Sequence, residues 1–379
     1  MRARRRMSAW AGLVVLLVLL GGCAIGGDPP PGSDLPQNAL DPAAGSPALD
    51  IDRLWNLVFP IAVAVFVLVQ GLILFVVFRF RSRGREDQET LPKQVAGNTR
   101  LEVMWTIIPA VILVGIAIPT VGTIFNLADR PPDEALDVRV VAKQYWWEFE
   151  YTGDEGQGVV TANELHIPTG RPIALDMHSL SAVQPDPGSG EDIVVGEPVS
   201  AGVVHSFWVP RLAGKQDVVP GHTRRMSIEA DAPGVYPGQC AEFCGLSHAR
   251  MRFEVIAHEP AEFEAWLAGQ TEPADPAADA LAQEGEEFFA GEGTCIACHA
   301  VDGLETATGT AAEVRVGPDL THFASRRRFA GGTFRVDDEA QLKQWLRNPQ
   351  AVKAGSQMPN LGLSDNQINA LTAYLYSLE

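Results

Sequence analysis

The sequence predicts a multidomain membrane protein that has a two-helix transmembrane hairpin, an all-β domain and an all-α domain. Two segments, 54–78 and 103–127, each run 25 residues without a formal charge. Between residues 137 and 257, short strand-like runs alternate with Gly, Pro and Asp turns. Residues 281–379 instead have helical patterning with long loops. These three sequence patterns follow one another along the chain, so we expect three separate structural parts.

The N-terminus has the pattern of an export signal of the lipoprotein type, which we expect over residues 1–22. A basic segment precedes a short apolar core, Trp10–Leu20, which is too short to span a bilayer comfortably. The run Leu20-Gly21-Gly22-Cys23 resembles a lipobox, in which cleavage would leave Cys23 as a lipidated first residue. A signal that another peptidase cleaves, or that is not cleaved, is the alternative. Residues 23–50, which are rich in Gly, Pro, Asp and Ser, are expected to form a flexible tether.

The transmembrane hairpin is expected over residues 51–130. Either apolar segment is long enough to cross a hydrocarbon layer of about 30 Å. Basic residues cluster between them, from Arg79 to Arg85, and the positive-inside rule places this loop in the cytoplasm. The N-terminus and everything after residue 127 then lie on the outer or periplasmic face of a bacterial inner membrane. A buried hairpin of a soluble protein is the alternative.

An all-β domain is expected over residues 131–267, because its strand-like runs are short and regularly spaced. The runs are 138–141, 172–177, 206–209, 225–230 and 252–257. An insertion at 185–196, rich in Pro, Gly and Asp, interrupts them and has no assigned role. A helical patch at 261–267 ends the domain, and residues 268–280 are expected to form a linker. Residues 281–379 are expected to form the all-α domain.

The chain is strongly acidic, with a formal net charge of -18, and the residues beyond 130 alone carry a net charge of -20. A polyanionic body repels nucleic acid, so DNA or RNA binding is excluded as a function. The charge suits a cationic partner, although it could equally serve only to keep an exported domain soluble. The five cysteines, an odd number, do not fit a simple disulfide framework. One fits lipidation, and the other four lie in two metal-binding motifs.

The first motif is Cys240-Ala-Glu-Phe-Cys244-Gly-Leu-Ser-His248-Ala-Arg-Met251, with His205 upstream at the start of a strand. Two thiolates, two imidazoles and a thioether form a soft ligand set that favours copper over hard cations. The second cysteine allows two thiolates to bridge two copper ions and share one electron between them. The alternatives are a structural zinc site, which would leave Met251 without a role, a disulfide between Cys240 and Cys244, and unrelated core residues.

The second motif, Cys295-Ile-Ala-Cys298-His299, is the attachment signature of c-type haem. Two thiols bond the haem vinyl groups, and the imidazole becomes an axial ligand of the iron. The sixth ligand is expected to be Met358, which favours electron transfer. His322 is the alternative ligand, although a lone loop histidine is usually solvated. The pattern also occurs in zinc ribbons and redox loops.

Helical signals surround the haem motif. Ser364-Asp-Asn-Gln367 is a capping-box pattern that opens a terminal helix. Gly285 and Phe289 precede the motif, as in cytochrome c folds, where the first and last helices cross. Residues 281–379 therefore resemble a class I cytochrome c, with a longer excursion at 301–340 than the minimal fold requires.

The copper motif, together with Val204-His205-Ser206-Phe207-Trp208-Val209-Pro210 and Leu101-Glu102-Val103-Met104-Trp105-Thr106, resembles subunit II of haem-copper cytochrome c oxidases. The resemblance covers roughly residues 50–267. It implies a cupredoxin-like domain in which Cys240 and Cys244 bridge the two coppers of a copper A centre. The implied remaining ligands are His205, His248, Met251 and the backbone carbonyl of Glu242. The Glu242 side chain would also reach a magnesium ion at the boundary with subunit I.

Two further roles are implied by the same resemblance. The run Lys143-Gln144-Tyr145-Trp146-Trp147-Glu148 resembles the family's aromatic patch, where electrons enter. Tyr145 stands where a tryptophan is usual, and the alternative is that these aromatics are a strand face in the core. Glu102 resembles a carboxylate at the cytoplasmic mouth of a proton path into subunit I, or it is simply a charged residue at a helix end.

Together, these parts resemble subunit II of a caa3-type oxidase. The resemblance implies that electrons pass from a cytochrome c-type donor to haem c, then to copper A, and then to subunit I, where oxygen is reduced and protons are pumped. The implied partners are subunit I, the other oxidase subunits, the donor and the membrane. The alternatives are the electron-entry subunit of a copper A nitric oxide reductase and a copper carrier or assembly factor. Met251 and the haem motif argue against a carrier, and a quinol oxidase subunit would lack the copper cysteines.

Overall fold

The computed structural model describes residues 44–81, 94, 96–128, 134–153, 156, 158–180, 202–277, 279–302, 304 and 317–379. These residues belong to one structural unit, Pro42–Glu379. The expected signal peptide with Cys23 and the insertion at 185–196 lie outside the described residues.

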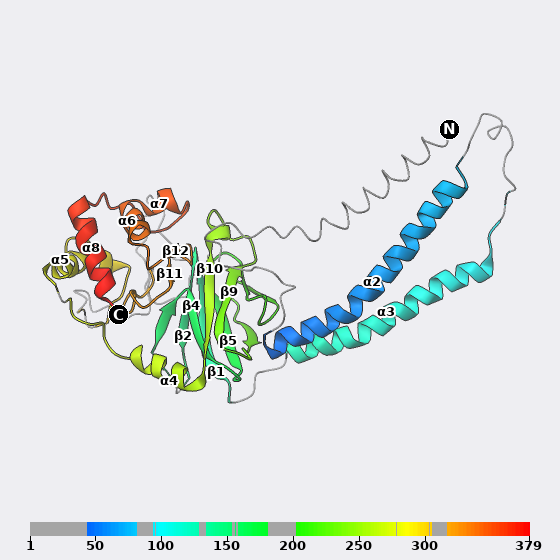
Figure 1. Ribbon diagram of the computed structural model, residues 1–379, viewed down its shortest axis with the longest axis horizontal. Helices are drawn as coiled ribbons and strands as arrows, with labels where there is room; N and C mark the ends of the chain where they lie inside the picture. Colours follow the sequence, from blue (N-terminus) through cyan, green and yellow to red (C-terminus); the bar gives the residue numbers. More distant parts are fainter. Residues whose placement is uncertain are drawn as a thin grey trace, which may run out of the picture. The chain divides into compact units, whose positions relative to one another are not determined.

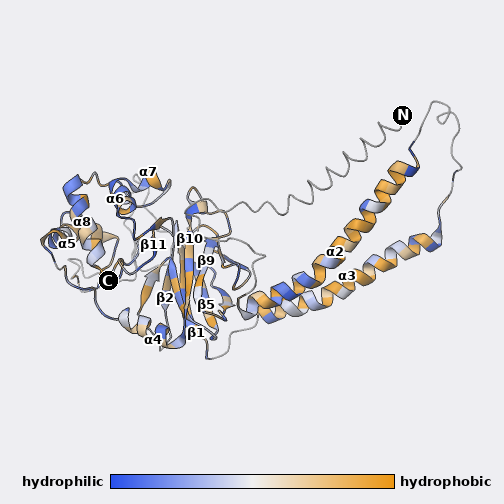
Figure 2. Ribbon diagram, viewed as in Figure 1, coloured by the Kyte–Doolittle hydropathy of each residue, from blue (hydrophilic) through white to orange (hydrophobic). Residues whose placement is uncertain are grey.

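Two long apolar helices come first, α2 (Ser46–Arg79) and α3 (Thr99–Ala128). Their lengths of 34 and 30 residues exceed the roughly 20 that cross a bilayer. Hydrophobic residues predominate along both helices (Figure 2), and no residue of their most apolar windows is buried in the described structure. In a buried hairpin of a soluble protein, most of these apolar residues would be covered by the rest of the chain. Helix α2 begins within the range expected as tether, where the Ser46 hydroxyl donates a hydrogen bond to Glu229 at 2.6 Å.

Residues 136–258 form two five-stranded sheets (Figure 1). One sheet has the order β3 (Val160–Ala162), β2 (Trp146–Tyr151), β1 (Leu136–Lys143), β5 (Ile173–Ser179) and β8 (Arg224–Ile228). The other has the order β4 (Glu164–Pro168), β10 (Arg252–His258), β9 (Gly234–Cys240), β6 (His205–Trp208) and β7 (Lys215–Val218). The β1–β5 and β4–β10 pairs are parallel. This β domain, taken here as residues 134–269, ends with helix α4 (Pro260–Gly269).

Aromatic side chains from both sheets fill the core of the β domain. Trp147 of β2 packs edge-on against Phe207 of β6, and both approach Phe253 of β10. All three side chains are fully buried. Burying large aromatics between two sheets supplies most of the hydrophobic driving force for a sandwich of this size. The expected all-β, cupredoxin-like architecture is therefore present.

The α domain, taken here as residues 279–379, contains α5 (Ala280–Ala290), α6 (Glu339–Arg347), α7 (Pro349–Val352) and α8 (Asp365–Ser377). Helices α5 and α8 cross at Gly285, where an added Cβ would lie 2.1 Å from the Ala370 carbonyl oxygen. The predicted capping box at Ser364 and Gln367 opens α8. A short hairpin of β11 (Arg328–Phe329) and β12 (Phe334–Arg335) lies within the expected excursion at 301–340. The helical patterning did not predict this hairpin.

Candidate metal and haem sites

Two sheet strands and one loop bring the predicted copper ligands together. His205 begins β6 and Cys240 ends β9, and these strands pair antiparallel. The chain then forms the 241–251 loop, which carries Cys244, His248 and Met251 and returns to the sheet at β10. The ligands therefore come from a rigid sheet end and one loop tied to it at both ends.

The two cysteine sulfurs lie at the centre of the cluster, 3.8 Å apart. The Cys240 sulfur lies 3.7 Å from Nδ1 of His205, and the Cys244 sulfur lies 3.7 Å from Nδ1 of His248. The Met251 sulfur lies 3.8 Å from that of Cys244, and the Glu242 carbonyl oxygen lies 3.2 Å from the Cys240 sulfur. Each sulfur thus has its own imidazole.

This geometry decides against a disulfide, because a bonded pair of sulfurs lies about 2.05 Å apart, and both cysteines are free. The hydrogen bond between the two side chains lowers the pKa of Cys240 and raises that of Cys244, so the pair holds on to one proton. Both sulfurs can be thiolates together only where cations lie beside them. The ligand atoms of His205, Cys240 and Cys244 all lie within 4.8 Å of one another, a spacing that fits soft metal ions.

The predicted aromatic patch lies partly in the core of the β domain and partly against the 241–251 loop, called the metal loop from here on. Trp147 is fully buried and its ring lies edge-on to His205, at 6.0 Å between centroids. Trp146 is covered by the Lys143 ammonium group, 4.6 Å from its ring centroid. The Tyr145 hydroxyl accepts a hydrogen bond from the Leu246 amide at 3.1 Å, and the Gln144 side chain donates to the Cys244 carbonyl at 2.7 Å. Residues 144–145 therefore support the 241–251 loop directly.

Tyr145 is also in contact with the α domain. Its carbonyl oxygen accepts a hydrogen bond of 2.8 Å from the Lys353 ammonium group. An added Cβ at Gly355 would lie 3.4 Å from the Tyr145 ring and 2.8 Å from the Leu246 side chain. The α domain therefore lies against the surface where the resemblance places electron transfer.

The haem motif lies after α5, in a single 3₁₀ turn, Cys295–Ala297. The His299 amide donates to the Cys295 carbonyl at 2.9 Å, which closes the turn. Nδ1 of His299 lies 2.8 Å from the Pro318 carbonyl oxygen, so this nitrogen carries the proton and Nε2 has a free lone pair that could bind a metal. Burial lowers the pKa of His299, which keeps the ring neutral as ligation requires.

The remaining predicted residues have different surroundings. Met358 packs against the same apolar core as Cys295 and Ile296. His322 was expected to be solvated, but it is buried. Its Nδ1 lies 2.9 Å from the carbonyl oxygen of Glu379. Glu102 is exposed in the first turn of α3, where its carboxylate accepts a hydrogen bond of 3.2 Å from the Asn98 amide. The contacts described for His322 and Glu102 do not involve the predicted copper ligands.

Three family profiles match successive parts of the chain. "Cytochrome C oxidase subunit II, transmembrane domain" matches residues 34–122, "Cytochrome C oxidase subunit II, periplasmic domain" matches residues 136–258, and "Cytochrome c" matches residues 282–379. The chain is 37% identical over 347 residues to cytochrome c oxidase subunit 2 of Alkalihalophilus pseudofirmus, which covers 90% of either protein. It is 36% identical over 316 residues to the same subunit of Bacillus sp. PS3, covering 79% of this chain and 80% of the relative.

The chain belongs to the cytochrome c oxidase subunit II family. The subunit 2 of Bacillus subtilis is a further relative, 33% identical over 81% of this chain and 82% of its own length. Membership makes this protein a subunit of a membrane oxidoreductase complex with a cytochrome c-type redox partner. Its β domain is the family's copper A domain, and its α domain is a haem-binding cytochrome c domain.

Proposed function

We propose that this subunit II belongs to a caa3-type oxidase and passes electrons from an external donor through haem c and then copper A to subunit I. The observation that carries the proposal is the contact between Lys353 and Gly355 of the α domain and Tyr145 and Leu246 beside the copper ligands. An electron donor built into the chain is useful only where it reaches its acceptor, and this contact brings the two domains together at that point. Oxygen reduction and proton pumping would take place in subunit I.

The copper A centre would hold two copper ions. Cys240 and Cys244 would bridge them, with His205, His248, Met251 and the Glu242 carbonyl as the outer ligands. Electron sharing across two thiolates keeps structural change on reduction small, which suits rapid transfer. The Glu242 side chain is exposed, so it can reach a magnesium ion at the boundary with subunit I.

The haem would be attached through thioether bonds from Cys295 and Cys298. His299 would bind the iron through Nε2, and Met358 would be the second axial ligand. A thioether ligand raises the reduction potential and blocks substrate access to the iron. A haem held by these four residues would supply electron transfer and not oxygen reduction.

The orientation in the membrane follows from the basic loop after α2. Both extramembrane domains would lie on the outer face of a bacterial inner membrane, with a lipid on Cys23 as a third attachment. Glu102, in the first turn of α3, would then face the cytoplasm, where protons enter subunit I.

Replacing Cys240 with Ser in the assembled oxidase tests the order of the relay. We expect the variant to lose the bridged copper pair while all four haem ligands stay intact. An external donor should still reduce haem c, but oxygen consumption should fall to near background. Metal analysis, the visible haem spectrum and an oxygen electrode measure the three effects.

The counterpart is Met358→Ala, which should impair reduction of haem c but leave copper A reducible by a small artificial donor. Normal turnover in the Cys240 variant would mean that electrons bypass copper A. A complex that consumes nitric oxide and not oxygen would favour the reductase alternative.

A further inference from the structure

Two glutamates with buried side chains lie side by side in one sheet of the β domain. Glu164 of β4 and Glu254 of β10 lie directly opposite each other across parallel strands. Each side chain is only 3% exposed. Like charges at opposed positions destabilise a sheet, and buried carboxylates require a cationic partner. The pair therefore implies that something positive binds at this edge.

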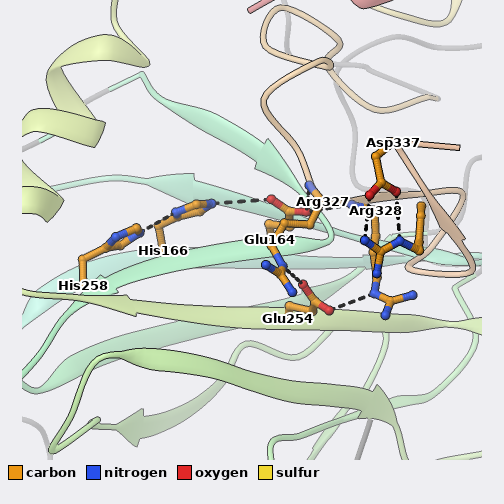
Figure 3. A network of polar contacts seen from close by, with 8 residues as sticks. Glu164, His166, Glu254, His258, Arg327, Arg328 and Asp337 are labelled. Carbon is orange, nitrogen blue, oxygen red and sulfur yellow. Dashed lines mark hydrogen bonds and ion pairs between the residues drawn. The ribbon is translucent and has the colours of Figure 1, made fainter. Parts of the chain in front are cut away.

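The α domain supplies that partner through Arg327 and Arg328 at the start of its β11–β12 hairpin (Figure 3). Nε of Arg327 and Nε of Arg328 each lie 2.8 Å from a different carboxylate oxygen of Glu254. The backbone amides of the same two arginines donate to one oxygen of Glu164, at 2.7 and 3.0 Å. Arg328 is buried, with a side chain 7% exposed. Two glutamates and two arginines therefore satisfy one another across the domain boundary.

Further residues fix the glutamates from either side. The other oxygen of Glu164 lies 3.6 Å from Nε2 of His166, whose Nδ1 lies 2.8 Å from Nε2 of His258. The His166 ring stacks on Trp266 at 4.0 Å. On the α-domain side, Asp337 pairs with Arg335 at 2.7 Å. Glu164, Glu254 and Arg328 are thus buried, which distinguishes their contacts from a surface ion pair of long, mobile side chains.

A second set of contacts continues from this site to the metal loop. The Arg252 amide donates to the Gly331 carbonyl at 2.9 Å. The Lys353 ammonium donates to the carbonyls of Tyr145 and Ala330, both at 2.8 Å. Gly331 has φ +68°, and an added Cβ there would lie 2.4 Å from the Tyr145 carbonyl oxygen. The hairpin that holds the arginines therefore also sets how closely the 353–355 segment approaches the 241–251 loop.

We propose that Glu164 and Glu254 form a docking site for the Arg327–Arg328 pair, and that this site holds the cytochrome c domain against the copper loop as a fixed donor. The surface around Tyr145 is then occupied by the chain's own α domain, so an external donor delivers its electron to that domain and not to copper A directly. The functional consequence rests on the proposed relay, whereas the docking itself does not.

Amide hydrogen exchange in the full-length protein tests the docking without any electron transfer. The amides of Arg327 and Arg328 are protected by Glu164, so their exchange reports whether the domains are in contact. In Glu254→Gln and in Arg328→Gln, we expect exchange over residues 326–333 to accelerate about tenfold or more, because each change leaves one buried partner unpaired. The double variant should exchange no faster than the faster single variant, since the two residues act on each other.

The matched control is Arg347→Gln, which removes an exposed ion pair with Asp365 inside the α domain. It should leave exchange over residues 326–333 unchanged. An unaltered haem spectrum in all variants shows that the α domain is still folded. Unchanged exchange in both single variants would overturn the docking proposal.

A second measurement separates the docking from the relay. After rapid photoreduction of haem c in the assembled oxidase, transfer to copper A should slow about tenfold or more in Arg328→Gln, because the donor is held near its acceptor less of the time. Faster exchange with an unchanged transfer rate would support the docking site but contradict its role in holding haem c as a fixed donor, whereas no transfer from haem c to copper A in the wild type would contradict the relay itself. Slow exchange together with unchanged transfer would overturn the docking site.

Discussion

Tyr145 shows how one residue can serve two neighbours at once. Its hydroxyl accepts a hydrogen bond from the Leu246 amide, within the loop that carries Cys244 and His248. Its carbonyl oxygen accepts one from Lys353 of the α domain. Burial lowers the pKa of Lys353 to about 7, so this lysine is held in a much less polar place than the surface. The side chain of Tyr145 supports the metal loop, while its backbone binds the neighbouring domain.

Tyr145→Phe should therefore loosen the metal loop without undocking the α domain. The variant leaves the Leu246 amide without its acceptor, at a cost of about 1 kcal/mol. We expect copper to be lost to a chelator several-fold faster than from the wild type, measured by the decay of the copper absorption. Exchange over residues 326–333 should stay slow.

Tyr236→Phe is the matched control. Its hydroxyl donates a hydrogen bond of 2.7 Å to the Ala232 carbonyl within the turn that begins β9. Both variants remove a hydrogen-bonded tyrosine hydroxyl, but of the two hydroxyls only that of Tyr145 is bonded to the metal loop. Equal rates of copper loss in the two variants would contradict the role given to Tyr145.

The elements of the fold were predictable wherever one local pattern decides them. The two apolar segments, the capping box before α8 and the metal motifs are all readable in sequence, because their residue types and spacing are specific to one structure. The β11–β12 hairpin was missed, since two-residue strands leave no periodicity to detect. The docking glutamates were missed for another reason. Glu164 and Glu254 sit in apolar strands, and only the β4–β10 pairing places them opposite each other.

A signal for the docking site was nevertheless present in the sequence. Arg326, Arg327 and Arg328 form a basic triplet in a strongly acidic part of the chain. A lone glutamate between Phe253 and Val255 is likewise unusual for a buried strand. The opposite charges of the arginine triplet and Glu254 could have suggested a pairing. The sequence could not show that they are in contact, because they lie more than 70 residues apart.

At the level of elements, helices α5 and α8 approach each other closely at Gly285. Gly285→Ala would place a methyl group 2.1 Å from the Ala370 carbonyl and 2.8 Å from Cβ of Tyr374, so the helices must separate. We expect a loss of about 1–3 kcal/mol in the free energy of unfolding of the α domain. Thermal unfolding followed by the haem absorption measures this loss.

The control is Gly269→Ala at the end of α4, where an added Cβ has no atom within 4 Å. This substitution should be neutral or slightly stabilising, because alanine favours a helix over glycine by up to about 1 kcal/mol. An unchanged free energy of unfolding in Gly285→Ala would show that the α5–α8 crossing tolerates a wider spacing than its contacts indicate.

At the level of the whole molecule, the linker and the docking site do different things. A flexible linker alone gives a donor an effective concentration in the mM range, yet leaves its orientation free. The Glu164–Glu254 site adds orientation, because it binds two adjacent residues of one hairpin through both backbone and side chains. The chain's acidity fits this arrangement, since the arginine pair is a local cationic patch that matches one anionic site within the same chain.

The docking site should therefore hold the two domains together even after the linker is cut. A protease site inserted between the exposed residues Glu272 and Pro273 allows cleavage of the folded, metal-loaded protein in detergent. We expect the cleaved α domain to stay bound during size-exclusion chromatography at moderate salt, because buried ion pairs are screened far less than exposed ones. The same cleavage in Arg328→Gln should release it, whereas Arg347→Gln should behave as the wild type. Immediate release of the wild-type α domain at low salt would mean that the linker, and not the docking site, keeps the haem beside the copper.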